Sequence, residues 1–325
     1  MGQGYEAQET TLGQDGAAAQ GELIDLADAR VRAGDHIVRG TAADGQVRAF
    51  AVTARASVQE MHERHQTSPV VTAALGRLLM AGQMMGAMSK SDDELITLTV
   101  RGEGPVGRIT VTANNRGQAK GFANHPHVWL PLNGQGKLDV GGGIGQGTLS
   151  VVHDVPHIEP YSSQVELVSG EIGDDLTSYF AISDQVPTSV GVGVLVNKDT
   201  SVKQAGGFII QLMPGYYEYL TDELEANLQG VTSVTSLMED GLTPTQILEK
   251  LLEGMDFKVL DVMPVSFRCD CSEDRAIRSA VALGEVELRD IIEKGETAEV
   301  FCHFCGKRYY LTPQKLAQMI VDMQG

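Results

Sequence analysis

Four cysteines near the C-terminal end constrain this chain more than any other feature. They are the only cysteines among 325 residues, and they form two close pairs, Cys269-Asp-Cys271 and Cys302-His-Phe-Cys305, with thirty residues between them. Zn²⁺ prefers four ligands in a tetrahedron, and four thiolates with no open position make a closed structural site rather than a catalytic one. We therefore predict one Zn²⁺ per chain, held by Cys269, Cys271, Cys302 and Cys305. His303 could replace one sulfur, but the cysteines already complete the shell.

Two functions are compatible with such a site. The metal could staple a small domain whose hydrophobic core is inadequate on its own. Alternatively, the thiols could form a redox switch, because disulfide formation removes the ligands and the folding energy that the metal supplies. That energy is on the order of ten kcal/mol for small zinc modules, so its loss should unfold residues 265–325. The residues alone favour the staple.

The balance of charge and hydropathy excludes some classes of function. The chain has 25 Lys and Arg against 43 Asp and Glu, a net charge of −18. Nucleic-acid binding depends on cations that neutralise phosphates, so we expect no nucleic-acid partner. No run of 18 apolar residues occurs, and the first residues resemble no secretory signal. We expect a cytoplasmic protein without membrane contact. In the reducing cytoplasm, clustered thiols more often bind metal or take part in redox chemistry than form structural disulfides.

Composition divides the chain into four parts. Residues 1–34 are rich in Gly, Ala, Gln and acidic groups, which predicts a disordered tail. Residues 35–213 form the main body, and residues 264–325 the zinc-binding domain. Residues 214–263 carry 10 acidic and 2 basic side chains and predict a metastable helical linker, because short helices depend on packing against something else. The three helices expected there are Tyr216–Leu228, Val231–Glu239 and Pro244–Leu252.

Strand signals joined by short turns dominate the body. Asp44-Gly45 divides His36–Phe50 into a hairpin, since Gly tolerates the positive φ of a tight turn. Further strands are expected at Leu95–Arg101, Arg108–Ala113, Thr148–His153, Gln164–Ser169, Ser189–Val196 and Gln204–Gln211. Helices are expected at Ser57–His65, Pro69–Ser89 and Glu171–Ile182. We predict an α+β fold, with a mixed, mostly antiparallel β-sheet domain followed by the helical linker and the small zinc-binding domain.

The helical stretch Pro69–Ser89 is a candidate binding surface. It carries four methionines, which adapt well to apolar partners. These are Met80, Met84, Met85 and Met88. Its small residues, such as Gly82 and Gly86, would equally allow close packing, and we favour a buried core helix.

The sequence offers no persuasive active site. Residues 139–148, Asp-Val-Gly-Gly-Gly-Ile-Gly-Gln-Gly-Thr, are glycine-rich, but a nucleotide fingerprint needs a helix directly after it, and a β-type segment follows here. We expect a loop between strands; a hydrolase or transferase that uses the glycine-rich loop near Gly143 is the weaker alternative. The histidines lack a partner acid or nucleophile at a recognisable spacing, so we expect them to be exposed or hydrogen-bonded, and the protein not to be an enzyme.

The cysteine pairs and their surroundings resemble the bacterial heat shock protein 33 family. The resemblance covers about residues 35–325 and includes separated segments in the expected order. They are Met263-Pro-Val-Ser-Phe-Arg-Cys-Asp-Cys, Val300-Phe-Cys-His-Phe-Cys-Gly, Gly207-Phe-Ile-Ile-Gln-Leu-Met-Pro, Gln164-Val-Glu-Leu-Val-Ser-Gly-Glu-Ile and Gly191-Val-Gly-Val-Leu-Val-Asn.

This resemblance implies a redox-regulated chaperone that holds unfolding client proteins without ATP. It implies an inactive reduced form with bound zinc, and an oxidised form that has lost zinc, unfolded its C-terminal region and dimerised. The implied disulfides are Cys269–Cys271 and Cys302–Cys305. We expect Cys302–Cys305 to form first, because two intervening residues allow a disulfide with less strain than one. The alternative is a constitutive zinc-stapled binding module.

The implied mechanism suggests where clients bind. The acidic linker would cover an apolar face of the body and expose it when the zinc domain unfolds. Candidate client-binding residues are Met80, Met84, Met88, Leu224 and Leu228.

Overall fold

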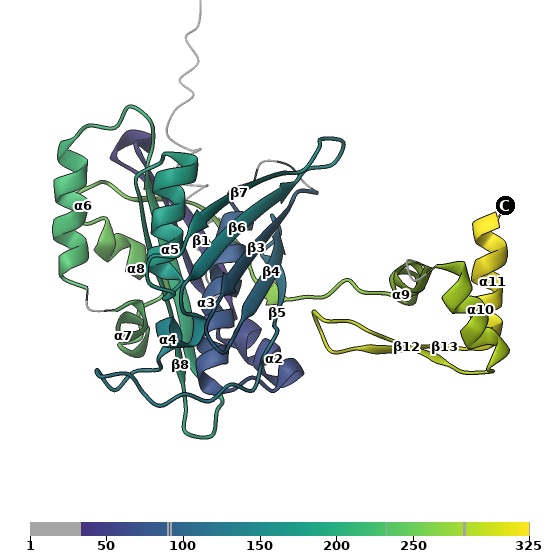
Figure 1. The fold of residues 1–325 in the computed structure, drawn as a ribbon. Helices are drawn as coiled ribbons and strands as arrows, with labels where there is room; N and C mark the ends of the chain where they lie inside the picture. Colours follow the sequence, from purple (N-terminus) through teal and green to yellow (C-terminus); the bar gives the residue numbers. More distant parts are fainter. Residues whose placement is uncertain (1–33, 90, 92, 232, 282–283, 325) are drawn as a thin grey trace, which may run out of the picture.

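The computed structural model describes residues 34–89, 91, 93–231, 233–281 and 284–324. The predicted tail, residues 1–34, lies outside these ranges apart from Gly34. An α+β body with two β-sheets carries a smaller C-terminal unit that projects from one side (Figure 1). The predicted fold class is confirmed. Every helix in the described ranges is too short or too polar to traverse a bilayer.

The first sheet contains five antiparallel strands in the order β10-β1-β2-β9-β8. Asp44 and Gly45 form the predicted hairpin turn, with φ angles of 51° and 88°. The strands are β1 (His36–Ala42), β2 (Val47–Thr53), β8 (Thr188–Val196), β9 (Val202–Leu212) and β10 (Lys258–Pro264). The sequence did not predict β10, which brings the end of the linker back to the edge of this sheet beside β1.

The second sheet contains six strands in the order β11-β5-β4-β3-β6-β7. They are β3 (Leu95–Gly102), β4 (Arg108–Asn114), β5 (Gln118–Ala123), β6 (Gly147–Asp154), β7 (Tyr161–Glu166) and β11 (Ser266–Phe267). Alternation along β3 buries Leu98 and Val100, while Thr97 and Thr99 bond to threonines of β4 on the other face. The two-residue β11, also unpredicted, pairs with β5 in parallel and joins the chain after the linker to this sheet.

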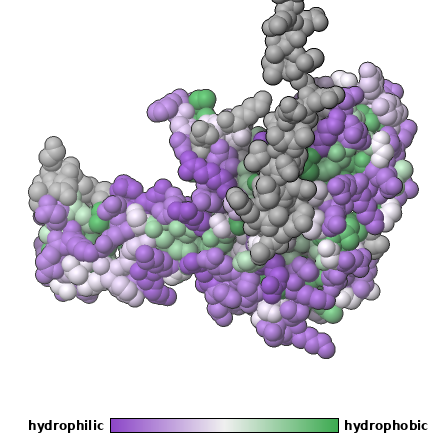
Figure 2. Space-filling view, turned by 180° about the vertical axis from the view of Figure 1, so that it is seen from behind, coloured by the Kyte–Doolittle hydropathy of each residue, from purple (hydrophilic) through white to green (hydrophobic). Residues whose placement is uncertain are grey.

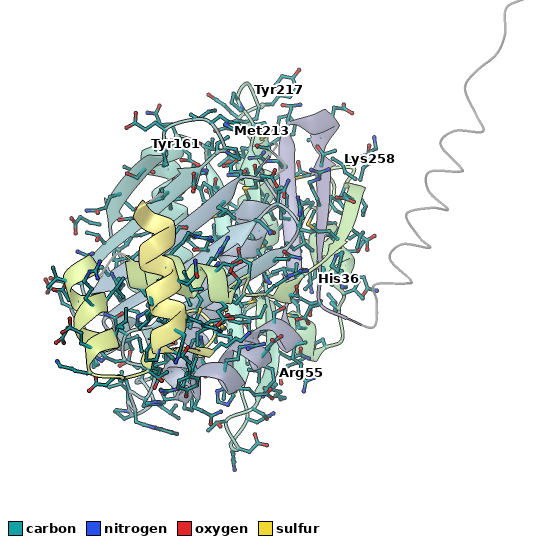
Figure 3. The ribbon with its side chains drawn as sticks, turned by 90° about the vertical axis from the view of Figure 1, so that its right-hand side faces the viewer. His36, Arg55, Tyr161, Met213, Tyr217 and Lys258 are labelled. Atoms are coloured by element: carbon teal, nitrogen blue, oxygen red, sulfur yellow. The ribbon has the colours of Figure 1, made fainter. Side chains whose placement is uncertain are left out.

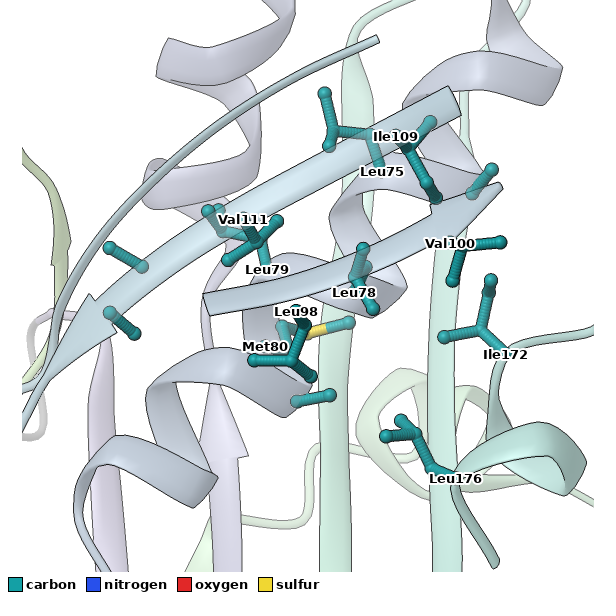
Figure 4. Close-up of a cluster of buried hydrophobic side chains, with 14 of the residues drawn as sticks. Leu75, Leu78, Leu79, Met80, Leu98, Val100, Ile109, Val111, Ile172 and Leu176 are labelled. Atoms are coloured by element: carbon teal, nitrogen blue, oxygen red, sulfur yellow. The ribbon is translucent and has the colours of Figure 1, made fainter. Parts of the chain in front are cut away.

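Helix α3 (Pro69–Gly86) lies between the two sheets, and sixteen of its eighteen residues are buried. Leu75, Leu78, Leu79 and Met80 meet side chains from β3, β4 and the region of α5 (Gly173–Tyr179), as Figure 4 shows. A Cβ on Gly82 would come within 2.8 Å of Val111, so glycine permits the close approach. The preferred prediction of a core helix is confirmed. Helix α2 (Arg55–His65) precedes α3.

The linker helices cover the other face of the first sheet. They are α6 (Tyr219–Gln229), α7 (Val234–Glu239) and α8 (Pro244–Leu251), close to the predicted ranges. Helix α8 begins with a capping box between Thr243 and Gln246. Ile247 and Leu248 pack with residues of β1, β2 and β9 in a second core that is distinct from the core around α3.

The C-terminal unit has a small core of its own. It contains α9 (Glu273–Val281), α10 (Glu285–Glu293), the hairpin β12 (Ala298–Phe301) and β13 (Arg308–Leu311), and α11 (Pro313–Gln324). Figure 3 is seen from the side of the C-terminal unit, so α10 and α11 lie in front of the body. Strands β1 and β10 of the body carry the labelled His36 and Lys258. Among its described residues, one cluster of five buried hydrophobic side chains lies apart from the other cores: Ala280, Leu288, Leu311, Leu316 and Met319. A bound metal would add support to a unit of this size.

The glycine-rich stretch differs from the predicted loop. Val140–Ile144 forms one turn of helix, α4, and the carboxylate of Asp139 caps it by accepting from the amide of Gly142. Strand β6 follows directly, as expected, and close backbone packing explains the glycines: a Cβ on Gly104 would come within 2.8 Å of the carbonyl oxygen of Ile144.

Candidate metal centre

The four cysteines come together at the joint between the body and the C-terminal unit. Cys269 and Cys271 lie in the segment between β11 and α9, and Cys302 and Cys305 lie in the turn of the β12–β13 hairpin. All four sulfurs lie within 4.8 Å of one another. The Sγ atoms of Cys269 and Cys302 are 3.7 Å apart, and those of Cys271 and Cys305 are 3.3 Å apart.

This arrangement fits a tetrahedral Zn²⁺ site. With Zn–S bonds of about 2.3 Å, the sulfurs of a tetrahedron lie about 3.8 Å apart, close to the two separations above. The four free thiols form the one group with metal-ligand geometry among the described residues. His303 is not part of it, because its ring packs against Phe122 and Phe301.

The hairpin turn positions its two sulfurs through backbone hydrogen bonds. The carbonyl of Cys302 accepts from the amides of Cys305, at 3.3 Å, and Gly306, at 2.9 Å, while the amide of Cys302 donates to the carbonyl of Lys307. Gly306 has a φ of 73°, a conformation that glycine adopts without strain. These hydrogen bonds and the conformation of Gly306 hold the sulfurs of Cys302 and Cys305 on the same side of the turn's backbone, toward the other cysteines.

Burial and hydrogen bonding give the thiols different pKa values. Burial raises the pKa of Cys269 well above its usual range and that of Cys305 to about 11. Burial also opposes ionisation of Cys271, but the hydroxyl of Tyr309, 3.1 Å from its sulfur, and the neighbouring thiols donate hydrogen bonds that lower its pKa to about 7. In the metal-free cluster, Cys271 is thus the group that ionises first among these three.

The site is packed against the body. The side chain of Cys305 is buried and belongs to the same core as α3, and the other three cysteines pack partly against that core. Phe304 lies edge-on to Phe122 of β5, with ring centroids 5.2 Å apart. The imidazole Nε2–H of His65, at the end of α2, donates to the carbonyl of Phe304 at 3.0 Å. Figure 2 shows hydrophobic residues at the surface where the C-terminal unit meets the body.

Comparison with known proteins agrees with this architecture. The family model described as Hsp33 protein matches residues 35–312. The chain belongs to the Hsp33 family. The 33 kDa chaperonin of Agathobacter rectalis is 52% identical over 88% of this chain and 99% of its own length, and that of a Geobacillus species is 48% identical over 88% of this chain and 97% of its own. The crystal structure of the Thermotoga maritima 33 kDa chaperonin aligns with a TM-score of 0.82 at 34% identity, covering 89% of this chain and 98% of that one.

The sequence did not indicate all the residues that surround the cysteine cluster of this Hsp33 family member. The side chain of Asp270 is half-exposed and forms ion pairs with Lys120 and Arg275. His65 was expected to be exposed or hydrogen-bonded, and it is hydrogen-bonded to Phe304. Lys120 and Phe122 carry no local motif, and only the tertiary fold brings them to the cysteines.

The candidate client-binding residues lie in two separate places. Met80 and Met84 are fully buried in the core around α3, and Met88 packs partly against it. Leu224, on helix α6 of the linker, is buried in the second core, and Leu228 of the same helix packs partly against that core. Contact with clients through Met80, Met84 or Leu224 therefore requires a conformation different from this one.

Proposed function

We propose that this chain is an ATP-independent holdase chaperone that thiol oxidation switches on. The observation that carries the proposal is the position of the four sulfurs between the body and the C-terminal unit, whose described residues form a separate cluster of five buried hydrophobic side chains. When bound, Zn²⁺ supplies a cross-link between residues 269–271 and residues 302–305. In the reducing cytoplasm, where we place this protein, the thiols would stay available for that role.

Oxidation removes the donors that make this cross-link. Two thiols lose two protons and two electrons as each disulfide forms, and hydrogen peroxide takes them up as it is reduced to two molecules of water. We propose Cys269–Cys271 and Cys302–Cys305 as the disulfides. Because all four sulfurs lie within 4.8 Å of one another, the resting geometry permits these pairs. Each disulfide removes two of four ligands, so the C-terminal unit loses its support.

The linker transmits this loss to the body. Only β10 and β11 separate α8 from Cys269, and these strands hold the edges of the two sheets. Unfolding of residues 264–325 would release this end of the linker, residues 214–263. The apolar face beneath, which includes Val38, Ala49 and Ile210, would then be exposed on the body, residues 35–213. We propose that this face, together with Leu224 and Leu228, binds unfolded clients. Met80, Met84 and Met88 contribute if the body opens further. We also propose that the oxidised chains form homodimers.

One experiment tests the switch. Reduced, zinc-loaded protein is treated with hydrogen peroxide under mild unfolding conditions, and free thiols, released zinc and suppression of aggregation of a heat-unfolding enzyme are followed in the same samples. We expect one zinc per chain to be released as the thiols disappear, and suppression to rise with it. A constitutive zinc-stapled binding module would instead suppress aggregation while still reduced. Zinc that stayed bound after thiol loss would contradict the switch.

A further inference from the structure

The body holds the residues that lie between the cysteines of each pair. Asp270 lies between Cys269 and Cys271, and Phe304 lies between Cys302 and Cys305. Both of these intervening residues contact side chains of the body that are remote in sequence. Side chains of the body therefore hold both cysteine-bearing segments, each at a residue that lies between its two cysteines.

Lys120 of β5 contacts both intervening residues. Its ammonium group forms an ion pair with the carboxylate of Asp270 and lies 4.9 Å from the centroid of the Phe304 ring. The side chain of Lys120 is only 16% exposed, so water screens this pair less than it screens a surface pair. One side chain therefore ties the two cysteine pairs to the same strand.

Phe304 is held on two further sides. The ring of Phe122, two residues along β5 from Lys120, meets it edge-on, and the imidazole of His65 donates a hydrogen bond to its carbonyl. Burial lowers the pKa of His65, so the imidazole is neutral near pH 7 and carries the Nε2–H that this bond requires. The Cys302–Cys305 turn is consequently fixed through both its side chain and its backbone.

Docking also shields a sulfur. Cys305 has a relative exposure of 7%, and it packs in the core of the body rather than with the described core residues of its own unit. An oxidant in solution reaches thiols in proportion to their exposure and thiolate character. Movement of the hairpin turn away from β5 would expose this sulfur before the C-terminal unit unfolds.

We propose that His65, Lys120 and Phe122 are positioning residues of the thiolate site, and that their grip on Asp270 and Phe304 sets how fast the thiols are oxidised. The inference rests on the proposed redox switch and adds an element of the body that controls its threshold. Weakening the grip makes the switch more sensitive to oxidant without changing any ligand. The body thus acts as a gate, because its contacts with Asp270 and Phe304 slow thiol oxidation. It is also the part of the protein whose apolar face oxidation exposes.

Two substitutions on β5 test this gate. In Phe122→Ala the ring contact with Phe304 is lost, and in Lys120→Met the ion pair with Asp270 is lost while a chain of similar length remains. Reduced, zinc-loaded proteins are treated with hydrogen peroxide, and thiol loss and zinc release are timed with a thiol reagent and a chromogenic chelator. We expect both rates to rise about 3- to 10-fold, the factor that corresponds to one aromatic pair or one partly buried ion pair.

Matched variants separate positioning from general destabilisation. Phe122→Tyr keeps the ring and should restore the wild-type rate. Lys198→Met removes an exposed lysine in the β8–β9 turn and controls for the change of charge. Ile109→Val thins the buried core on the neighbouring strand β4 and lowers the melting temperature without touching Phe304. We expect wild-type oxidation rates in all three.

The outcomes also distinguish this inference from the proposed function. If Phe122→Ala and Lys120→Met oxidise at the wild-type rate while the wild type still releases zinc and becomes active, the gate is wrong and the switch stands. Acceleration in Ile109→Val equal to that in Phe122→Ala would likewise overturn the gate, since stability alone would explain both rates. If the wild type retains zinc after thiol loss, the switch itself fails.

Discussion

Cys271 and His303 are both close to the hairpin turn, but only the cysteine can be a ligand in this geometry. Cys271→Ser should reduce bound zinc to well below one per chain, because a serine hydroxyl does not replace a thiolate. His303→Ala should retain one zinc, since its ring packs against Phe122 and Phe301 outside the sulfur cluster. Metal analysis of the purified reduced proteins measures this directly. Loss of zinc in His303→Ala alone would show that the shell is not made of four sulfurs.

The thiol pKa values predict how metal affinity depends on pH. Cys269 and Cys305 have raised pKa values, to about 11 for Cys305, so both carry protons at pH 7 in the absence of metal. A metal binds thiolates, and each protonated ligand must lose its proton on binding. Affinity therefore rises as pH rises and falls as pH falls. Calorimetric titration of reduced, metal-free chain with zinc in two buffers of different ionisation enthalpy should show release of at least about two protons per chain; release of none would contradict these assignments.

The sequence could predict the cluster of four cysteines, but not the residues that hold it against the body. Each cysteine pair is local, and the spacing of its two sulfurs is visible in a stretch of three or four residues. His65, Lys120 and Phe122 come from α2 and β5, and they reach Asp270 and Phe304 only because β11 aligns beside β5. Neither their residue types nor their spacing distinguishes them from ordinary surface residues.

At the scale of single elements, local signals decided which predictions succeeded. Helix α8 has a capping box and proline at its start, and its observed bounds nearly match the predicted ones. By contrast, β11 contains two residues and exists only through its pairing with β5, so no period or propensity could reveal it. The one-turn helix α4 likewise depends on the cap from Asp139 and on close backbone packing.

Helix α8 offers a test of the linker as a cover. Leu248 is fully buried against the first sheet, so Leu248→Ala should weaken the docking of the linker by about 2–4 kcal/mol through lost contacts and a cavity. Hydrogen exchange in α6, α7 and α8 should accelerate, and the reduced, zinc-loaded protein should suppress client aggregation in part. Glu249→Ala, the adjacent exposed position on the same helix, is the control. Unchanged exchange with gain of activity would argue against the linker as the cover.

Over the whole molecule, hydrophobic residues are divided among three cores of very different size. Among the described residues, the core around α3 joins both sheets, the second core lies under the linker, and the third, in the C-terminal unit, contains five buried side chains. The sulfur cluster belongs to the first of these cores although the hairpin carrying half of it belongs to the C-terminal unit. Removal of the metal should therefore act on the smallest core while leaving the largest intact.

A chelator separates the contribution of the metal from that of the disulfides. Zinc removal from fully reduced protein should unfold residues 264–325, because the free energy of a structural zinc site, on the order of ten kcal/mol, is comparable with the whole stability of a domain. Hydrogen exchange followed by peptide should show loss of protection in α9, β12 and β13, while α3 keeps its protection. Returning zinc under reducing conditions should restore the original pattern, which excludes irreversible damage. If β12 and β13 stayed protected without zinc, the C-terminal unit would be stable on its own, and oxidation would have to act on the body by a route other than unfolding.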